Sequence, residues 1–251
     1  MTETAAVEEL NPDGKSRILL LCDHATAIVP PEINGGDLGI PAEDMARHIA
    51  YDIGARGVTA GLSALLDAPA ILTRFSRLVI DPNRGEDDPT LVMKLYDGTI
   101  IPANREVGPR EVARRLAAYH RPFHRAITAR IAAMEAAGRA PALVAMHSFT
   151  PQLRGRAPRP WHVGVLWHRD GRIALPLMAR LREAGWCVGD NEPYLGELEG
   201  DTMSQHGTGR GLPHVLIEVR QDLIGAEADQ RLWAERLAPI LTAVIEETPD
   251  G

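Results

Sequence analysis

Polar side chains that can bind a metal or transfer protons follow several short apolar runs of this 251-residue sequence. Such runs are typical of strands buried on both faces of an α/β sheet, where ligands bind beyond the carboxyl ends of the strands. His24 ends one run, His147 ends another, and Glu218 lies inside a third. Histidines and carboxylates that leave one position open for water are the donors of a catalytic zinc site, with a glutamate as general base. The pattern therefore predicts one divalent metal ion per chain, most consistent with zinc.

Each of these residues also has a purely structural interpretation. A histidine at the end of a strand can simply be hydrogen-bonded there. Glu218 and Arg220 alternate on one face of the predicted strand, so they can form a buried ion pair. Arg84, which follows another apolar run, can be a surface residue solvated by the three acidic residues just beyond it.

A further carboxylate is predicted on the buried side of a helix. Beyond Pro41, apolar residues recur at helical spacing, and His48 and Asp52 fall on the same stripe. A carboxylate buried there must be paired or must bind a cation. Asp52 can therefore form an i,i+4 pair with His48, or it can be a metal ligand with His48 behind it.

Apolar runs and helical patterns alternate along the chain, and these elements must position the polar residues. The alternation predicts an α/β fold with a mixed, mostly parallel sheet and helices on both faces. We expect a flexible tail over residues 1–15, one domain over 16–251, and functional loops over 85–108 and 150–160. The apolar runs cover residues 17–24, 70–73, 78–81, 142–147, 162–167 and 215–219, and further helical patterns cover 109–138, 173–184 and 226–247.

Composition excludes several classes of function. The net charge is −7 with scattered Lys and Arg, which argues against nucleic acid or an anionic membrane as a partner. Cys22 and Cys187 form no C-x-x-C, so a metal must be held by His and carboxylates. The first fifteen residues lack a signal-peptide pattern and no apolar run is long enough to span a membrane, so a cytoplasmic location is expected. Neither glycine-rich nucleotide-binding motif occurs.

Several short motifs, taken together, resemble the N-formylglutamate amidohydrolase family over residues 19–224. Their order along the chain makes the combination more specific than any one of them. They lie at residues 23–25 (Asp-His-Ala), 29–30, 48–55, 76–84, 147–151 (His-Ser-Phe-Thr-Pro), 191–194, 206–207 and 211–223.

That family is distantly similar to zinc carboxypeptidases and aspartoacylases. The resemblance implies a three-layer α/β/α sandwich of the zinc-carboxypeptidase-like, or phosphorylase/hydrolase-like, kind. It also implies that Asn83 and Arg84 bind a substrate carboxylate, that His147 binds zinc, and that Glu218 is the general base. In those enzymes a carboxylate ligand follows the first His by three residues, whereas Ala27 stands there in this chain. A second departure is Cys22-Asp23-His24-Ala25. Family members that act in histidine degradation tend to have Pro-His-Ser/Ala-Gly at these positions.

The residues and the resemblance together predict an amidohydrolase for a small N-acyl amino acid such as N-formylglutamate. The expected zinc ligands are His24, Asp52 and His147, with Arg220 stabilising the oxyanion next to Glu218. Tyr194 and His206 are expected to complete the pocket around the carboxylate site of Asn83 and Arg84. The alternatives are another N-acyl amino acid deacylase or carboxypeptidase-like hydrolase, and a non-catalytic carboxylate-binding protein on the same fold.

Overall fold

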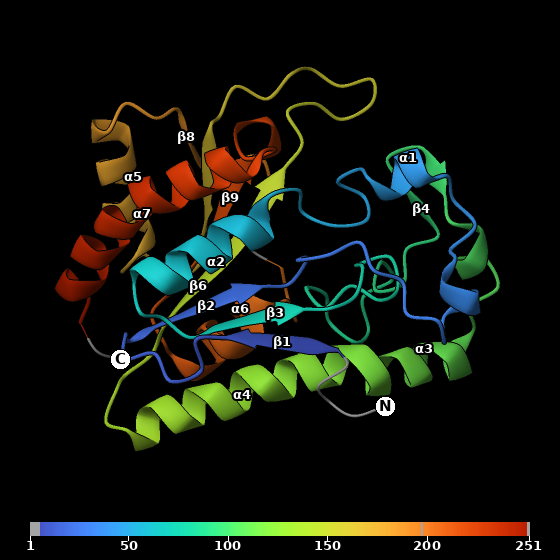
Figure 1. The fold of residues 1–251 in the computed structure, drawn as a ribbon, viewed down its shortest axis with the longest axis horizontal. Helices are drawn as coiled ribbons and strands as arrows, with labels where there is room; N and C mark the ends of the chain where they lie inside the picture. Colours follow the sequence, from blue (N-terminus) through green and yellow to red (C-terminus); the bar gives the residue numbers. More distant parts are fainter. Residues whose placement is uncertain (1–5, 197, 250–251) are drawn as a thin grey trace.

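A seven-stranded mixed sheet forms the centre of the molecule (Figure 1). The computed structural model describes residues 6–196 and 198–249. Across the sheet the strands follow the order β1, β3, β2, β6, β9, β7, β8. Their bounds are Val7–Leu10 (β1), Ile18–Cys22 (β2), Ala70–Thr73 (β3), Ala142–Phe149 (β6), Val163–Leu166 (β7), Val188–Asp190 (β8) and His214–Arg220 (β9). A separate hairpin joins β4 (Leu95–Tyr96) to β5 (Thr99–Ile100).

Most pairings in this sheet are parallel, as predicted. β2 pairs in parallel with β3 and β6, β9 with β6, and β8 with β7. β1 on β3 and β7 on β9 are antiparallel. Because β2, β6 and β9 are parallel neighbours, the residues at their carboxyl ends meet at one edge of the sheet.

Helices cover both faces of the sheet and confirm the three-layer α/β/α prediction (Figure 1). One face packs Leu20, Val144 and Ile217 against α2, α5 and α7. The other face packs Leu19 and Leu143 against α4 and α6. The helix bounds are Ala42–Met45 (α1), Ala55–Leu65 (α2), Pro109–Arg115 (α3), Arg121–Ala136 (α4), Ala174–Glu183 (α5), Thr202–His206 (α6) and Glu227–Glu247 (α7), and one π-helical turn (Leu116–His120) joins α3 to α4.

The helix predicted beyond Pro41 begins there but is much shorter than expected. It ends at Met45, residues 46–54 form turns, and α2 begins at Ala55. Gly54 has φ +80°, and a Cβ there would lie 2.2 Å from the carbonyl oxygen of Ile224. The Asp52 amide donates to the His24 carbonyl at 2.9 Å instead of to a helical partner. These contacts hold Asp52 in a loop above the end of β2.

Two other local predictions also fail. Residues 78–81 form turns rather than a strand, although their apolar side chains are buried. The tail predicted over residues 1–15 contains β1, which is ordered because it pairs with β3; residues 1–5 lie outside the described residues. In the part of the chain that the structure describes, no helix is long and apolar enough to cross a membrane.

Candidate metal centre and active site

Two histidines and one aspartate meet at the carboxyl end of the sheet. His24 follows β2, His147 lies on the neighbouring strand β6, and Asp52 reaches them from the loop before α2. Their donor atoms all lie within 4.8 Å of one another, and all three residues are buried. Asp52 Oδ2 lies 3.4 Å from His24 Nδ1 and 2.9 Å from His147 Nδ1. Two imidazole nitrogens and one carboxylate oxygen are a donor set that suits zinc and leaves a fourth position for water.

The outer nitrogens of both rings face carboxylates. His24 Nε2 lies 2.7 Å from Asp81 Oδ1, whereas His147 Nε2, 4.0 Å from Asp23 Oδ2, has no hydrogen-bond partner among the described residues. His24 Nδ1 is buried and has no hydrogen-bond partner among the described residues. A carboxylate on the outer nitrogen orients a metal-binding histidine and makes its inner nitrogen a better donor. His24 therefore has the surroundings of a metal ligand, with its bare nitrogen turned to the centre.

Arg77 adds a buried positive charge that the sequence analysis did not assign. Its Nη2 and Nε donate to Asp81 Oδ2 at 2.7 and 3.1 Å, and its Nη1 lies 3.5 Å from Asp52 Oδ1. The available signal was its position four residues before Asp81 in an apolar stretch. Burial alone would raise the pKa of Asp81, but Arg77 and His24 hold it well below its usual range. Arg77 thus keeps the carboxylate behind His24 ionised.

The charged groups at the centre shift one another's pKa values. Burial alone would raise the pKa of Asp52, but His24 and His147 outweigh it and lower that pKa below its usual range. Burial alone would lower the pKa of His147, but the hydrogen bond and charge of Asp52 raise it to about 9. The protein without metal therefore holds a proton where the two rings meet the carboxylate. A bound cation would take the place of that proton.

Glu218 stands beside the centre on the next strand. The β6–β9 register places it directly opposite His147. Its side chain is buried, and Oε2 has no hydrogen-bond partner among residues 6–196 and 198–249. Burial raises the pKa of Glu218 to about 7, against the lowering effect of His147. A carboxylate with that pKa can both accept and return a proton near neutral pH.

A cavity of about 340 Å³ connects the centre to Asn83 and Arg84. Arg84 is partly exposed to it; its Nη1 donates to the Asn83 carbonyl at 2.7 Å and its Nε to Thr90 Oγ1 at 3.2 Å. Asn83 is held from two sides. Its backbone amide donates to Asp81 Oδ1, and its side-chain Oδ1 accepts from the backbone amide of Thr202. We call residues 81–84 the anchor loop. Among the described residues, the ion pair found for Arg84 is with Asp88, at 4.0 Å, so the guanidinium can still bind an anion.

Comparison with known proteins identifies the family. The sequence pattern of N-formylglutamate amidohydrolases matches residues 16–225. The chain belongs to the N-formylglutamate amidohydrolase family.

Three solved structures share the fold of this chain. The Agrobacterium tumefaciens gene product Atu2144 is 35% identical, with a TM-score of 0.91 over 97% of this chain and 96% of its own. N-formylglutamate amidohydrolase from Ralstonia eutropha is 22% identical, with a TM-score of 0.70 over 95% of this chain and 99% of its own. A bacteriophage poly-gamma-glutamate hydrolase shares the fold at 8% identity, with a TM-score of 0.50 over 96% and 91%. A search among curated proteins found no match.

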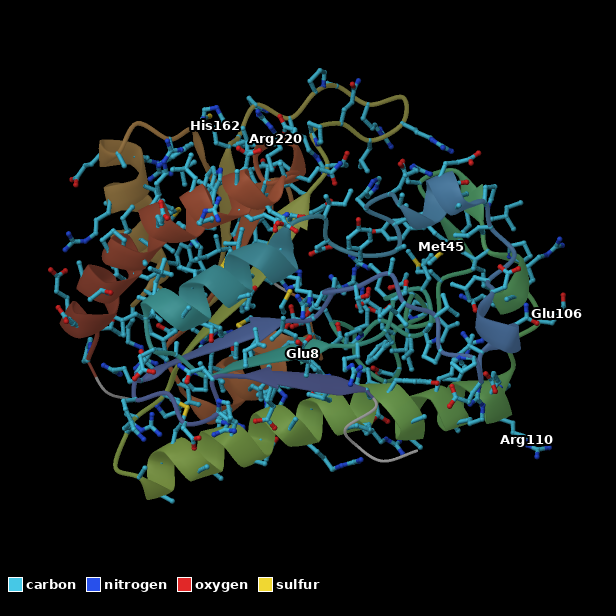
Figure 2. The ribbon with its side chains drawn as sticks, viewed as in Figure 1. Glu8, Met45, Glu106, Arg110, His162 and Arg220 are labelled. Atoms are coloured by element: carbon cyan, nitrogen blue, oxygen red, sulfur yellow. The ribbon has the colours of Figure 1, made fainter. Side chains whose placement is uncertain are left out.

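Arg220 does not reach the cavity of this family member. Its guanidinium is bound to Asp222 at 2.8 Å and to the carbonyl oxygens of Arg159, Pro160 and Trp161 at 3.2–3.3 Å. Figure 2 shows it at the same rim of the molecule as His162, whose carbonyl accepts from the Arg220 amide. The predicted oxyanion role is therefore not supported by its position, because these neighbours already satisfy its donors. Arg77 is the buried guanidinium at the centre.

His206 lies behind the anchor loop rather than in the cavity. It forms a histidine cluster with His120 and His124. His124 Nε2 donates to the Pro82 carbonyl at 3.0 Å, and His120 Nε2 donates to the Arg84 carbonyl at 2.9 Å. A carbonyl can only accept, so His124 Nδ1 must accept from His206 Nε2, at 2.9 Å.

Burial leaves the histidine cluster uncharged. It lowers the pKa of His124 to about 3 and that of His206 to about 4, and it also lowers the pKa of His120. The cluster therefore supports the backbone that carries Asn83 and Arg84. Tyr194, in contrast, does line the cavity, where its hydroxyl accepts a hydrogen bond from Arg159 at 3.1 Å.

Proposed function

We propose that this protein is a zinc-dependent amidohydrolase that cleaves the amide bond of N-acyl amino acids such as N-formylglutamate. The observation that carries the proposal is the bare, buried Nδ1 of His24 beside His147 and Asp52. Leaving such an atom unpaired is costly unless a cation occupies the centre. Membership of the N-formylglutamate amidohydrolase family supports the amide substrate.

His24, Asp52 and His147 would hold the zinc ion. When bound, zinc supplies a Lewis acid that polarises the amide carbonyl and lowers the pKa of a water molecule. Asp81 would keep His24 oriented, and Arg77 would keep Asp81 ionised. Side chains of the protein would carry out proton transfer and substrate binding.

Glu218 would accept a proton from the attacking water and return it to the leaving nitrogen. The water oxygen bonds to the acyl carbon, the carbon–nitrogen bond breaks, and the products are a carboxylic acid and a free amino acid. A pKa near 7 suits both transfers. Arg84 would bind the α-carboxylate, since a planar guanidinium matches its geometry, and would orient the amide over the centre.

The direct test combines metal analysis with turnover. The purified protein should contain about one zinc per chain and should release formate from N-formyl-L-glutamate. A chelator should abolish turnover, and added zinc should restore it. The variant His162→Ala, at a half-buried histidine away from the centre, should behave like the wild type. A protein that binds no metal at this centre, or one with full turnover after complete metal removal, would overturn the proposal.

A further inference from the structure

A closed loop carries Tyr194 into the cavity. Asn191 has a φ of +51°, and its side-chain Oδ1 accepts hydrogen bonds from the backbone amides of Trp167 and Gly196, at 2.9 and 3.1 Å. One side chain therefore ties the two ends of residues 191–196 to each other and to the end of β7. We call residues 191–196 the tyrosine loop. Tyr194 lies in the middle of this loop and lines the cavity, so the loop fixes the place of its side chain.

Two glycines let the tyrosine loop pass close to Glu218. Gly164 of β7 is paired directly with Glu218 of β9. A Cβ at Gly164 would lie 2.1 Å from the carbonyl oxygen of Glu192 and 3.4 Å from Glu218 Cβ. A Cβ at Gly189 would lie 2.6 Å from the same carbonyl oxygen. A larger residue at either position would push the loop away from the sheet, so the glycines keep Tyr194 on the Glu218 side of the cavity.

The Tyr194 hydroxyl accepts one hydrogen bond and has its own proton free. Arg159 Nη1 donates to the hydroxyl oxygen at 3.1 Å, and the Arg159 guanidinium lies over the Tyr194 ring, 4.8 Å from its centroid. Among the described residues, none accepts a hydrogen bond from this hydroxyl. Partial burial and the negative charge of Glu218 raise the pKa of Tyr194 to about 12, so the hydroxyl keeps its proton at neutral pH. A donor on its oxygen makes that O–H group a stronger donor in turn.

Arg159 is itself fixed from several sides. Its Nη1 also donates to the Thr150 carbonyl at 3.1 Å, and its backbone amide donates to the Pro151 carbonyl at 2.8 Å. Its own carbonyl accepts from Arg220 Nη1 at 3.3 Å. Arg159 does not line the cavity itself, so its charge reaches the cavity through the Tyr194 hydroxyl.

Amide hydrolysis calls for a hydrogen-bond donor at the carbonyl oxygen. That oxygen gains negative charge when water adds to the acyl carbon, and a donor held in place there is worth about 10²–10³ in kcat. Arg77 turns its guanidinium to Asp81 and Asp52 and so has little left to offer. Tyr96 also lines the cavity, but no described residue forms a hydrogen bond that would orient its hydroxyl. Tyr194 has both a free proton and a partner that holds its oxygen.

We propose that Tyr194 donates a hydrogen bond to the oxyanion formed from the amide carbonyl, and that Arg159 is a positioning residue that orients and polarises this hydroxyl. This inference rests on the proposed amidohydrolase function and adds two residues to it. The proton stays on Tyr194 throughout, while Glu218 takes a proton from the attacking water and returns it to the leaving nitrogen. Because the hydrogen bond strengthens only as charge develops on the oxygen, its loss should lower kcat and leave KM nearly unchanged.

The experiment measures kcat, KM and zinc content of the zinc-loaded proteins with N-formyl-L-glutamate. Tyr194→Phe should lower kcat by about 10²-fold, with KM within about threefold of the wild type and the zinc content unchanged. Tyr96→Phe removes the competing hydroxyl and should lower kcat by less than about threefold. Tyr119→Phe, at a tyrosine buried outside the cavity, is the matched control and should keep the wild-type kcat.

A double-mutant cycle tests the part of Arg159. Arg159→Met should lower kcat by about tenfold when Tyr194 is present. Arg159→Lys should restore part of that loss, because an ammonium group can still donate to the hydroxyl oxygen. In the Tyr194→Phe background, Arg159→Met should have almost no further effect on kcat, since the hydroxyl through which it acts is gone. Losses that multiply in the double variant would show that Arg159 does not act through Tyr194.

Failure of this inference can be told apart from failure of the proposed function. Turnover by the wild type with kcat of Tyr194→Phe within a few-fold of it, or a larger loss in Tyr96→Phe, would overturn the role of Tyr194 and leave the amidohydrolase standing. A rise in KM without a fall in kcat in Tyr194→Phe would make Tyr194 a substrate-binding residue only, which also overturns the proposal. No hydrolysis of any N-acyl amino acid by the zinc-loaded wild type would remove both.

Discussion

Two groups of buried histidines lie on either side of the anchor loop, and they differ in what surrounds their rings. In His24 and His147, each ring nitrogen has a carboxylate oxygen at a distance between 2.7 and 4.0 Å. The histidine cluster of His120, His124 and His206 has carbonyl oxygens and another imidazole as hydrogen-bond partners. All five residues are buried, so depth in the protein does not separate the two groups.

The difference in hydrogen-bond partners shifts the pKa values of the two groups in opposite directions. Asp52 raises the pKa of His147 to about 9, whereas burial lowers the pKa of His124 to about 3. A centre with excess negative charge attracts a cation, while a neutral cluster can only exchange hydrogen bonds. Carboxylate partners, rather than the number of nearby histidines, therefore distinguish the candidate metal centre from the structural cluster.

Loss of a histidine should have the largest effect at the metal centre. His24→Ala and His147→Ala each remove one of the three proposed zinc donors, so bound zinc and turnover should both fall to background. Elemental analysis and formate release are the measurements. His206→Ala removes a member of the other group and should keep about one zinc per chain. If His206→Ala loses the metal while His147→Ala keeps it, the two groups have been assigned the wrong way round.

Removing the proposed base should lower turnover without changing the zinc content. Glu218→Gln keeps the shape of the side chain but cannot accept a proton, so kcat should fall by about 10²–10⁴. Zinc content should remain that of the wild type, because Glu218 is placed beside the donors and not among them. A variant with kcat within a few-fold of the wild type would rule out the role of Glu218 as general base.

The anchor loop should control substrate binding. Arg84→Ala removes a charged hydrogen-bonding pair worth about 1.5–3 kcal/mol, so KM for N-formyl-L-glutamate should rise by about 10–100-fold. Arg84→Lys should recover part of this loss, since lysine keeps the charge but not the planar fork. The α-carboxamide analogue serves as the control, because its slow hydrolysis should hardly change in Arg84→Ala. Equal turnover of acid and amide by the wild type would show that Arg84 anchors no carboxylate.

The smallest effect concerns the stability of the histidine cluster at low pH. The pKa of His124 is lowered to about 3 by folding, so the unfolded chain binds more protons once the pH falls below about 6.5. Stability contributed by neutral His124 is therefore present above pH 6.5 and is lost progressively as the pH falls towards 3. At pH 5 the loss for this one residue amounts to about 2 kcal/mol.

Urea unfolding of the metal-free protein at pH 7 and pH 5 measures this loss. The variant His124→Gln keeps hydrogen-bonding groups but does not titrate, so it should lose less stability than the wild type over the same interval. The difference between the two proteins removes the contributions of Glu218 and His147, which both share. If wild type and variant lose the same amount, His124 is not held neutral by the fold.

Much of the fold was predictable because its signals are local. Continuous apolar runs predicted β2, β6, β7 and β9, since strands buried on both faces leave no polar positions. The periodic stripe over 109–138 predicted the long helical segment of α3 and α4. The prediction failed over residues 46–54, where helical spacing is present but Gly54 and the contact of Asp52 with the His24 backbone favour turns.

Some residues of the candidate site could be predicted from the sequence, and others could not. His24 and His147 could be chosen from the sequence because each follows or ends an apolar run, and parallel neighbouring strands bring such residues to one edge. Arg77 and Asp81 could not be assigned their places, because their roles depend on a loop that folds back under His24. Arg220 and His206 match the family motifs, yet their side chains point to other partners.

The order of residues along the chain was enough to predict the family, the alternation of strands and helices, and the polar residues at the ends of buried strands. These features follow from the order of apolar and polar residues along the chain, which is a local property. Which side chains share a site became clear from the folded structure alone. A side chain with several possible partners is oriented by the charges and hydrogen-bonding groups that surround it in space, and for Asp52, Arg77 and Arg220 those groups come from distant parts of the chain.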